Sequence, residues 1–269
     1  IKRGSLSGFY GSWTQEFFGG YEVKRLEEEW CKKFKVNHAI SMNSNTSGLY
    51  ASMGAIEISP GDEVIVPPLT MSATAMSSII YGGIPIFADI DKDTFCIDIE
   101  DVKRKINSKT KAIISVNLFG NPAANHELLK LCRNKNIYLI EDNAQAPLAT
   151  EQGRYTGTIG DIGIFSLNYH KHIHSGEGGI CVTNNPKLAL RLQGIRNHGE
   201  NIVKHTSCST VNMIGFNFRM TELSASIGYV QLKKIESEVR KRKKLAEKIS
   251  AGIGSLEGIS APFIRKDCE

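Results

Sequence analysis

The sequence contains no apolar run approaching the roughly 20 residues that a membrane-spanning helix requires. Its N-terminus also lacks the basic-then-apolar order of a secretory signal peptide. We therefore expect a cytoplasmic protein with no membrane partner. Polar low-complexity stretches and internal repeats of roughly 20 to 50 residues are missing too, which argues against a disordered chain and against a repeat architecture.

The cysteines show no paired spacing. None belongs to a CxxC motif, so the sequence indicates neither a structural zinc site nor a disulfide framework. We interpret all of them as reduced thiols and expect no metal ion. The six are Cys31, Cys96, Cys132, Cys181, Cys208 and Cys268.

The remaining composition is ordinary for a globular protein. Hydrophobic residues make up 41% of the 269 residues, charged residues make up 23%, and the formal net charge is +5. The densest basic cluster lies at residues 233–244 and is interrupted by Glu236 and Glu238. Phosphate binding favours a continuous basic surface, so this pattern is typical of a solvated helix face and not of a nucleic-acid-binding arm.

Short apolar strands alternate with helices along most of the chain. Val23, Leu26, Trp30 and Phe34 recur at helical spacing and predict the first helix. Strands are predicted at residues 39–41, 64–66, 85–88, 111–116, 137–141, 162–166 and 179–182. Further helices are predicted at residues 46–56, 71–81, 99–106, 124–134, 187–196 and, with a break, 221–253. This alternation predicts an α/β fold whose largely parallel sheet is covered on both faces.

The length exceeds what one compact core usually serves, so we expect one large domain and part of a second. We predict an N-terminal arm at residues 1–20 and a large domain at 21–235. Residues 236–269 would then form a linking helix and the start of a small C-terminal domain. We expect the remainder of that small domain to lie beyond this sequence.

Four polar clusters stand out along the chain. In open α/β sheets ligands bind at the carboxyl ends of strands, so polar residues that directly follow predicted strands are candidate site residues. The clusters are Ser44-Asn45-Thr46, residues 141–145, Ser166 with the loop up to residue 179, and residues 215–219.

The first two clusters each allow a functional and a structural interpretation. The turn at residues 44–46 joins a strand to a helix, where free backbone N–H groups attract a phosphate, but a simple helix N-cap explains the same residues. Asp142 ends an apolar strand, where an ionised carboxylate needs a cationic partner such as a protonated pyridine nitrogen. The alternative for Asp142 is an N-cap or salt-bridge aspartate. Gln145 could reach another atom of the same ligand.

Lys171 lies in a polar loop between two core strands, among His170, His172 and His174. Cationic neighbours lower the pKa of a lysine, as an imine-forming amine requires, whereas the alternative is an exposed surface lysine. Alternating histidines in a loop with no fourth ligand nearby argue against a metal site. The Gly-Glu-Gly-Gly run at residues 176–179 predicts a tight turn that brings the backbone close to another group.

Five segments have the order and spacing of one known family. They are PGDEVIVP at residues 60–67, EDNAQA at 141–146, FS at 165–166 with Lys171 and GEGG after it, RNHG at 196–199, and NFRMTE at 217–222. Together they resemble the DegT/DnrJ/StrS family of pyridoxal-phosphate-dependent sugar aminotransferases over nearly the whole chain. The resemblance implies fold type I, the aspartate-aminotransferase type. That fold is a three-layer sandwich around a mostly parallel seven-stranded sheet, with a small C-terminal domain that is largely absent from this chain.

The resemblance also implies a role for each candidate residue. Lys171 would form a Schiff base with pyridoxal 5'-phosphate, Asp142 would pair with the pyridine nitrogen, and Gln145 would contact the phenolic oxygen. The cofactor phosphate would be held by Ser166 and by the turn Ser44-Asn45-Thr46.

Two further expectations concern the partners of the chain. Asn217 matches a position that reaches the phosphate of the neighbouring subunit, so the resemblance implies a homodimer with shared active sites. The implied reaction passes through pyridoxamine 5'-phosphate and moves an amino group, with glutamate as donor, to a nucleotide-linked keto sugar. The product would be an amino sugar for a surface polysaccharide or a secondary metabolite.

Three departures from the common family pattern affect these expectations. Met71 stands where many members place an aromatic residue against the cofactor ring, and a thioether gives a softer contact. Asn45 replaces the usual glycine of the phosphate turn, which is tolerable because asparagine accepts left-handed geometry better than most residues. Residues 168–174 differ from the commonest family sequences, so a substrate outside the usual nucleotide-linked hexoses is an alternative.

Two rival functions remain. One is a cofactor-dependent sugar dehydratase on the same scaffold, in which the lysine is replaced by histidine; here the aligned residue is Lys171, and His172 is out of register by one position. The other is a non-catalytic regulatory or binding relative that uses residues 233–244 for nucleic acid. The intact set of candidate residues argues against a binding relative, which has no need of an imine-forming lysine.

Overall fold

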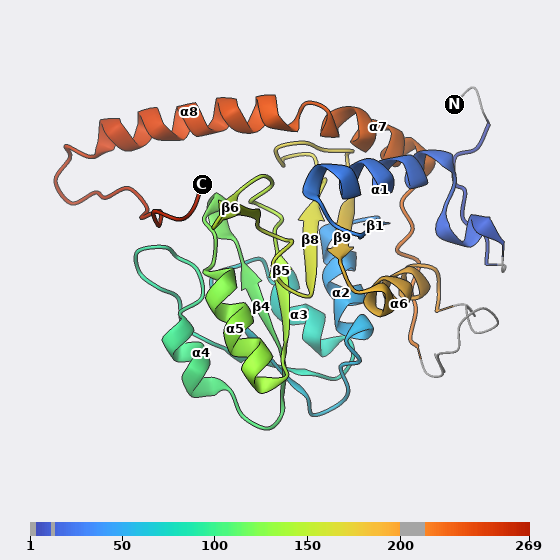
Figure 1. Ribbon diagram of the computed structural model, residues 1–269, viewed down its shortest axis with the longest axis horizontal. Helices are drawn as coiled ribbons and strands as arrows, with labels where there is room; N and C mark the ends of the chain where they lie inside the picture. The colour runs from blue at the N-terminus through green and yellow to red at the C-terminus, as the bar shows by residue number, and fades with distance from the viewer. Residues whose placement is uncertain (1–3, 12–13, 200–212) are drawn as a thin grey trace.

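The computed structural model describes residues 4–11, 14–199 and 213–269 (Figure 1). At its centre is a seven-stranded sheet in the order β1-β9-β8-β5-β4-β2-β3. The strands are β1 (His38–Met42), β2 (Glu63–Val66), β3 (Ile84–Phe87), β4 (Thr110–Val116), β5 (Tyr138–Asp142), β8 (Ile162–Ser166) and β9 (Gly179–Thr183). Neighbouring strands pair in parallel except around β9, which is antiparallel to both β1 and β8. The predicted mostly parallel seven-stranded sheet is confirmed.

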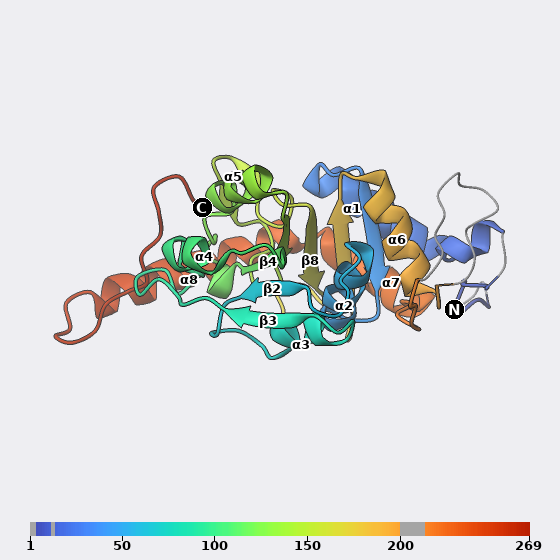
Figure 2. The ribbon, with the colours of Figure 1, turned by 90° about the horizontal axis from the view of Figure 1, so that it is seen from below.

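Helices cover both faces of this sheet and complete a three-layer sandwich (Figures 1 and 2). On one face, α2 (Asn45–Ala55), α3 (Ala73–Ile79) and α6 (Pro186–Arg196) enclose the largest core cluster. On the other face, α1 (Tyr21–Phe34) and α7 (Glu222–Leu232) cover β1, β9 and β8, while α4 (Ile99–Lys105) and α5 (Asn125–Lys135) cover β2, β4 and β5. Successive strand residues such as Leu139 and Ile140 point to opposite layers, and both are fully buried.

The first helix forms where the apolar spacing predicts it. Val23, Leu26, Trp30 and Phe34 are all buried along one side of α1. The Trp30 ring stacks on Phe34 with 5.0 Å between ring centroids, and both rings contact Phe165 of β8. Burial of such large side chains against a sheet stabilises a helix far more than intrinsic helix propensity does.

The helix predicted at residues 71–81 is shorter in the structure. It begins at Ala73 and ends at Ile79, because Met71 belongs to the loop after β2 and a turn through Gly82, whose φ is 80°, leads into β3. The long helix predicted from residue 221 is broken between α7 and α8 (Ile235–Ile253). Four short elements were not predicted. They are η1 (Gln15–Phe18), η2 (Leu118–Gly120), β6 (Thr150–Glu151) and β7 (Arg154–Tyr155).

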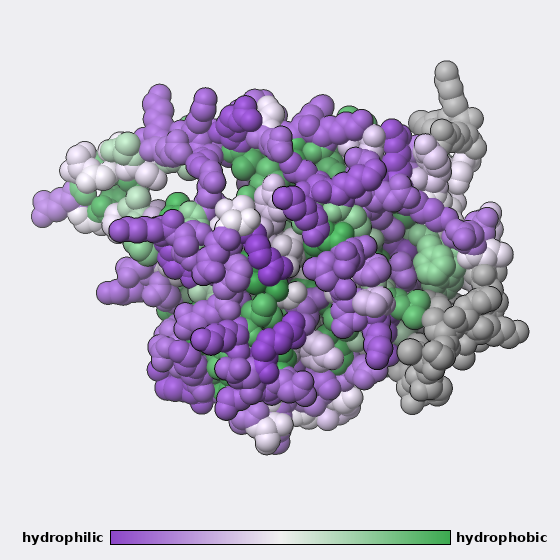
Figure 3. Space-filling view, viewed as in Figure 1, coloured by the Kyte–Doolittle hydropathy of each residue, from purple (hydrophilic) through white to green (hydrophobic). Residues whose placement is uncertain are grey.

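Helix α8 runs along one end of the sandwich and projects beyond it (Figure 1). Residues 240–244, the centre of the basic cluster, are exposed on this helix, and hydrophilic side chains dominate it in Figure 3. The chain then returns to the hairpin β6–β7, where the backbones of Thr150 and Glu269 exchange two hydrogen bonds. Arg265 forms an ion pair of 3.2 Å with the buried Glu151 at the same place.

The RNHG and NFRMTE segments serve first as structural connections. Arg196, which is fully buried, forms an ion pair of 2.6 Å with Glu27 and donates to the Phe18 carbonyl oxygen. Glu222 accepts hydrogen bonds from the Glu22 and Val23 backbone N–H groups at the start of α1. Both segments therefore fasten the N-terminal part of the chain to the sandwich.

Five of the six cysteines lie among the described residues, and all five are free thiols, as predicted. Cys208 lies outside the described residues. Within the same described ranges, no cluster of three or more His, Cys, Asp or Glu side chains could hold a metal ion. None of the helices in the described part of the chain has the length and apolarity needed to cross a bilayer.

Candidate active site

The predicted site residues gather at one edge of the sheet. Strands β1, β2, β4, β5 and β8 all run in the same direction, so their carboxyl ends meet there, and the antiparallel β9 begins there. The segments that follow these strands carry the turn at residues 44–46, Met71, Asp142 with Gln145, and Ser166 with Lys171. This arrangement brings together residues that are far apart in the sequence.

The turn after β1 opens helix α2. The Ser44 side chain accepts a hydrogen bond of 3.0 Å from the Ser47 N–H, so Ser44 is the N-cap of this helix. The N-cap interpretation is therefore correct for Ser44, and it leaves the backbone N–H groups of Asn45 and Thr46 in the first turn to meet an anion. Asn45 begins the helix with ordinary helical geometry. The ability of asparagine to adopt a left-handed conformation is therefore not needed at this position.

The glycine run before β9 explains how close the turn lies to the sheet. Gly176 is left-handed, with a φ of 85°. A Cβ atom on Gly179 would lie 2.4 Å from the Ser44 carbonyl oxygen and 2.7 Å from the Asn45 nitrogen. The group that the glycine run was predicted to approach is thus the turn at residues 44–46, and only glycine permits this contact.

Asp142 lies at the end of β5 and is almost fully buried. Its carboxylate accepts a hydrogen bond of 3.1 Å from the Ala144 N–H, and longer ones of 3.4 Å from the side chains of Asn45 and Thr74. Burial raises the pKa of Asp142, while these hydrogen bonds and the charge of Lys171 lower it. Among the described residues, no Lys, Arg or His nitrogen lies within 4.0 Å of this carboxylate. The site therefore holds a buried acid that lacks a close cationic partner.

Lys171 lies in the loop between β8 and β9 and is half-buried. Burial lowers the pKa of its ammonium group, and the charge of Asp142 opposes this shift. The predicted cause, cationic histidines, is wrong for His172. Burial, together with the charges of Arg242 and Lys171, lowers the pKa of His172 to about 4, so its imidazole is neutral at neutral pH. The neutral amine form of Lys171 is thus favoured by removal of its side chain from water, and not by the charge of His172.

Gln145 faces the same edge from the turn after β5. Its side-chain oxygen accepts a hydrogen bond of 2.8 Å from the Phe119 N–H. Because this bond fixes the oxygen, the amide nitrogen of Gln145 is the group left to donate to a ligand. Phe119 was missed by the sequence argument, although it follows β4 just as the predicted residues follow their own strands.

Ser166 and Asn217 complete the predicted set from two directions. Ser166 ends β8 and its hydroxyl accepts a hydrogen bond of 3.3 Å from the Asn168 N–H. Asn217 is exposed, and its backbone oxygen accepts a hydrogen bond of 3.2 Å from the side chain of Asn43, immediately before the turn at residues 44–46. The side chain of Asn217 is therefore presented at the surface, while its backbone is fastened to the turn.

Met71 is 69% exposed, so little of its side chain is covered by the described residues. Its carbonyl oxygen accepts a hydrogen bond of 3.0 Å from the Thr74 N–H, and Thr74 in turn reaches Asp142. Thr74 is fully buried and was also missed, because it lies inside a predicted helix and not directly after a strand.

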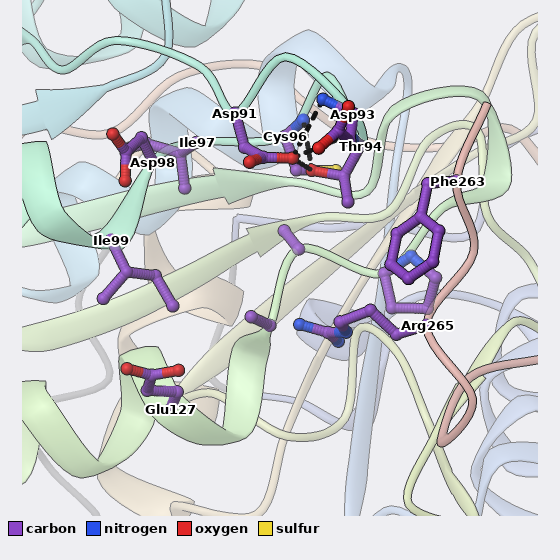
Figure 4. Close-up of a pocket in the computed structure, with 13 residues that line it drawn as sticks. Asp91, Asp93, Thr94, Cys96, Ile97, Asp98, Ile99, Glu127, Phe263 and Arg265 are labelled. Carbon is purple, nitrogen blue, oxygen red and sulfur yellow. Dashed lines mark hydrogen bonds between the residues drawn. The ribbon is translucent and has the colours of Figure 1, made fainter. Parts of the chain in front are cut away.

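A separate hollow of about 300 Å³ lies between the loop before α4, the start of α5 and the C-terminal segment (Figure 4). Asp91, Asp98 and Glu127 line it together with Arg265. The Asp91 carboxylate is already bonded to the Thr94 hydroxyl and N–H. This hollow contains none of the predicted site residues.

The residues at the sheet edge fit pyridoxal 5'-phosphate. A protonated pyridine nitrogen would give Asp142 the cationic partner that it lacks, and the N–H groups that open α2 suit a phosphate. Asn45 Oδ1 and the Nδ1 atom of His172 are buried without a hydrogen-bond partner among the described residues. Polar atoms of this kind are usually satisfied by a bound group or by water.

Comparisons with known proteins cover nearly the whole chain. The model of the DegT/DnrJ/EryC1/StrS aminotransferase family matches residues 12–268. GDP-perosamine synthase of Vibrio cholerae is 36% identical over 228 residues, which cover 85% of this chain and 61% of that relative. The chain therefore spans less than two thirds of the length of this relative.

Two solved structures share the fold over most of the chain. S. venezuelae DesV, in complex with a ketimine intermediate, has a TM-score of 0.86 and 31% identity, covering 93% of this chain and 66% of that one. The E. coli GDP-4-keto-6-deoxy-D-mannose-3-dehydratase with bound hydrated PLP has a TM-score of 0.80 and 32% identity, covering 88% of this chain and 66% of that one. A protein that holds a ketimine intermediate and a dehydratase thus share this architecture.

Proposed function

The chain belongs to the DegT/DnrJ/EryC1/StrS aminotransferase family, and on this premise we propose that it transfers an amino group from glutamate to a nucleotide-linked keto sugar. Enzymes of this family depend on pyridoxal 5'-phosphate. The observation that carries the proposal is that one sheet edge holds both Asp142, a buried acid without an ion-pair partner among the described residues, and Lys171, a half-buried amine. The five free thiols among the described residues support a reducing, cytoplasmic location.

Each residue of the site has one task in this proposal. Asp142 would accept a hydrogen bond from the protonated pyridine nitrogen, while Gln145 would donate from its amide nitrogen to the phenolic oxygen. The turn at residues 44–46 and Ser166 would hold the phosphate, and Met71 would pack against the ring. Lys171 would hold the cofactor covalently through its Nζ atom, and the free Nζ amine would accept and return the proton. When bound, the cofactor supplies an electron sink for the carbon that loses a proton.

The attachment of the cofactor to Lys171 is tested by borohydride reduction of the purified holoenzyme followed by peptide mapping. The expected result is a pyridoxyl group on the peptide that contains Lys171. A pyridoxyl group on another lysine would overturn the site, and a protein that takes up no cofactor would favour a non-catalytic relative.

The reaction is tested with glutamate and GDP-4-keto-6-deoxy-D-mannose, the sugar in the name of one structural neighbour. Formation of 2-oxoglutarate and an amino sugar supports aminotransfer. Loss of water from the sugar without net transfer of nitrogen supports the dehydratase instead. Lys171, and not a histidine, at the aligned position favours aminotransfer.

We expect Gly179→Ala to weaken pyridoxal phosphate binding by about 10–100-fold, because the added Cβ would displace the backbone of the turn at residues 44–46. Fluorescence titration of the apoprotein with cofactor measures this change. Gly252→Ala is the matched control, since a Cβ on Gly252 in α8 meets nothing within 4 Å. Equal cofactor affinity in the two variants would show that the close contact does not shape the phosphate site.

The proposed functional unit is a homodimer in which Asn217 reaches the phosphate of the neighbouring site. Support comes from an apolar surface on α3 and the edge strand β3, at one end of the sheet (Figure 2). Met76, Ile79, Ile84 and Phe87 are between 46% and 51% exposed on this surface. Contiguous apolar surface of this kind usually marks a protein interface, and a bare edge strand invites pairing or cover.

We expect Phe87→Asp to raise the dimer dissociation constant by at least about 30-fold, because a desolvated aromatic contact at an interface often contributes 2 kcal/mol or more. Sedimentation velocity over a dilution series measures it. Ile259→Asp is the control, since Ile259 is 53% exposed and lies after α8, outside α3 and β3. A dimer that resists Phe87→Asp as well as it resists the control would place the interface elsewhere.

A further inference from the structure

The most exposed large apolar side chains of the described residues surround the candidate site. They are Phe119 at 74%, Tyr169 at 71% and Met71 at 69% exposure. Each stands on a loop that follows a different strand at the same edge of the sheet. Met71 is already assigned to the cofactor ring, so the two aromatic side chains have no role in the proposed function.

Phe119 is unusual in its backbone as well as in its exposure. Its φ and ψ are 55° and 19°, the left-handed region that glycine and asparagine adopt readily and that a bulky residue rarely adopts. Its N–H donates to the side-chain oxygen of Gln145 at 2.8 Å. The chain therefore keeps a large apolar ring in a strained conformation, beside a cofactor contact, without burying it.

Neither feature benefits the isolated chain. An exposed phenyl ring gains nothing from burial, and glycine would relieve the strain at this position. Strained residues that persist beside a site commonly act on a ligand. Of the two substrates that must lie next to the cofactor, only the sugar has a ring with an apolar face of C–H groups suited to contact with an aromatic ring.

We propose that Phe119 determines substrate specificity by packing its ring against the apolar face of the sugar, while its N–H positions the Gln145 side chain. This inference rests on the proposed function, because it takes a keto sugar as the substrate. It makes the loop after β4 part of the sugar site, and it separates the two roles of the residue: the backbone serves the cofactor side, and the ring serves the sugar.

Two variants at the position separate these roles. Phe119→Gly keeps the backbone N–H and removes the ring, whereas Phe119→Tyr keeps a ring of nearly the same shape. For Phe119→Gly we expect a KM for GDP-4-keto-6-deoxy-D-mannose about 10–100-fold higher. The half-reaction with glutamate, measured by cofactor absorbance, should change less than about twofold because the Gln145 contact survives. Phe119→Tyr should stay within about threefold of the wild type in both measurements.

Two measurements that need no catalytic turnover test the same inference. Phe119→Gly should raise the melting temperature of the cofactor-free protein by about 2–4 °C, since it relieves the left-handed strain. Calorimetric titration with the same GDP-linked sugar should give weaker binding to Phe119→Gly than to the wild type, by the same factor as the rise in KM.

Three results would overturn the inference. These are an unchanged KM and sugar affinity in Phe119→Gly, a melting temperature that does not rise, and a dimer weakened as much as by Phe87→Asp, which would assign the ring to the subunit contact. Failure of the proposed function itself has a different signature, because the wild-type protein would then form no 2-oxoglutarate from glutamate.

Discussion

Replacing Lys171 with alanine is expected to slow amino transfer by on the order of 10⁴-fold while leaving the fold and the cofactor pocket intact. The amine is half-buried beside Asp142, and the variant removes both the covalent attachment and the proton carrier. Steady-state assay of 2-oxoglutarate formation measures the loss. Lys187→Ala is the control, because Lys187 is an exposed lysine at the start of α6 and should leave the rate unchanged.

The same lysine predicts the direction of the pH dependence. Only the neutral amine can accept a proton, so the rate should fall as the pH decreases and the amine becomes an ammonium ion. Burial lowers the pKa of Lys171, and this fall should therefore occur at lower pH than an exposed lysine would give. A rate profile that is identical in wild type and Lys171→Arg would contradict a proton-transfer role, because arginine stays protonated throughout.

Asp142→Asn is expected to have opposite effects on the cofactor-free and the cofactor-bound protein. Without cofactor the variant should melt at a higher temperature at neutral pH, because it removes a buried carboxylate that has no close cation. With cofactor, affinity should fall by about 10²–10³-fold, because removal of one member of a buried ion pair leaves the other uncompensated. Thermal melts and cofactor titration of the same preparations measure the two effects.

The sign of the stability effect follows from the raised pKa of Asp142. A carboxyl whose pKa is higher in the folded than in the unfolded protein lowers stability as the pH rises above the unfolded value of about 3.9. The free energy of unfolding keeps falling until the pH exceeds the pKa of Asp142 in the folded protein. Asp142→Asn should remove this decrease. Asp101→Asn should act in the opposite direction, because a hydrogen bond from the Asp89 N–H lowers the pKa of Asp101. Destabilisation of the apoprotein by both variants would contradict the assignment of Asp142.

The positions of Asp142 and Lys171 could be predicted because they depend on local pattern and strand direction. A mostly apolar strand followed by a polar turn places its last residue at the sheet edge, whatever the strand pairs with. Parallel strands then bring such edges together. The same logic located the turn at residues 44–46 and Ser166, and it needed no knowledge of the strand order.

Contacts between distant segments could not be predicted in this way. The pKa of Lys171 depends on its burial, which is set by the packing of segments far from it in the sequence. The partner of Gly179 was unknown, because it depends on the pairing of β1 with β9. Phe119 was missed for another reason: its significance lies in a backbone conformation and an exposed ring that no apolar period encodes.

The antiparallel pairing of β1 with β9 sets a limit on when the site can form during synthesis. Met42 of β1 pairs with Gly179, which emerges about 140 residues later, or roughly 7–28 s later at ordinary rates of translation. Until then the turn at residues 44–46 cannot pack against β9, because that strand has not been synthesised. Cofactor capture should therefore be a late event in the biogenesis of this protein, and the appearance of bound cofactor would report a completed sheet.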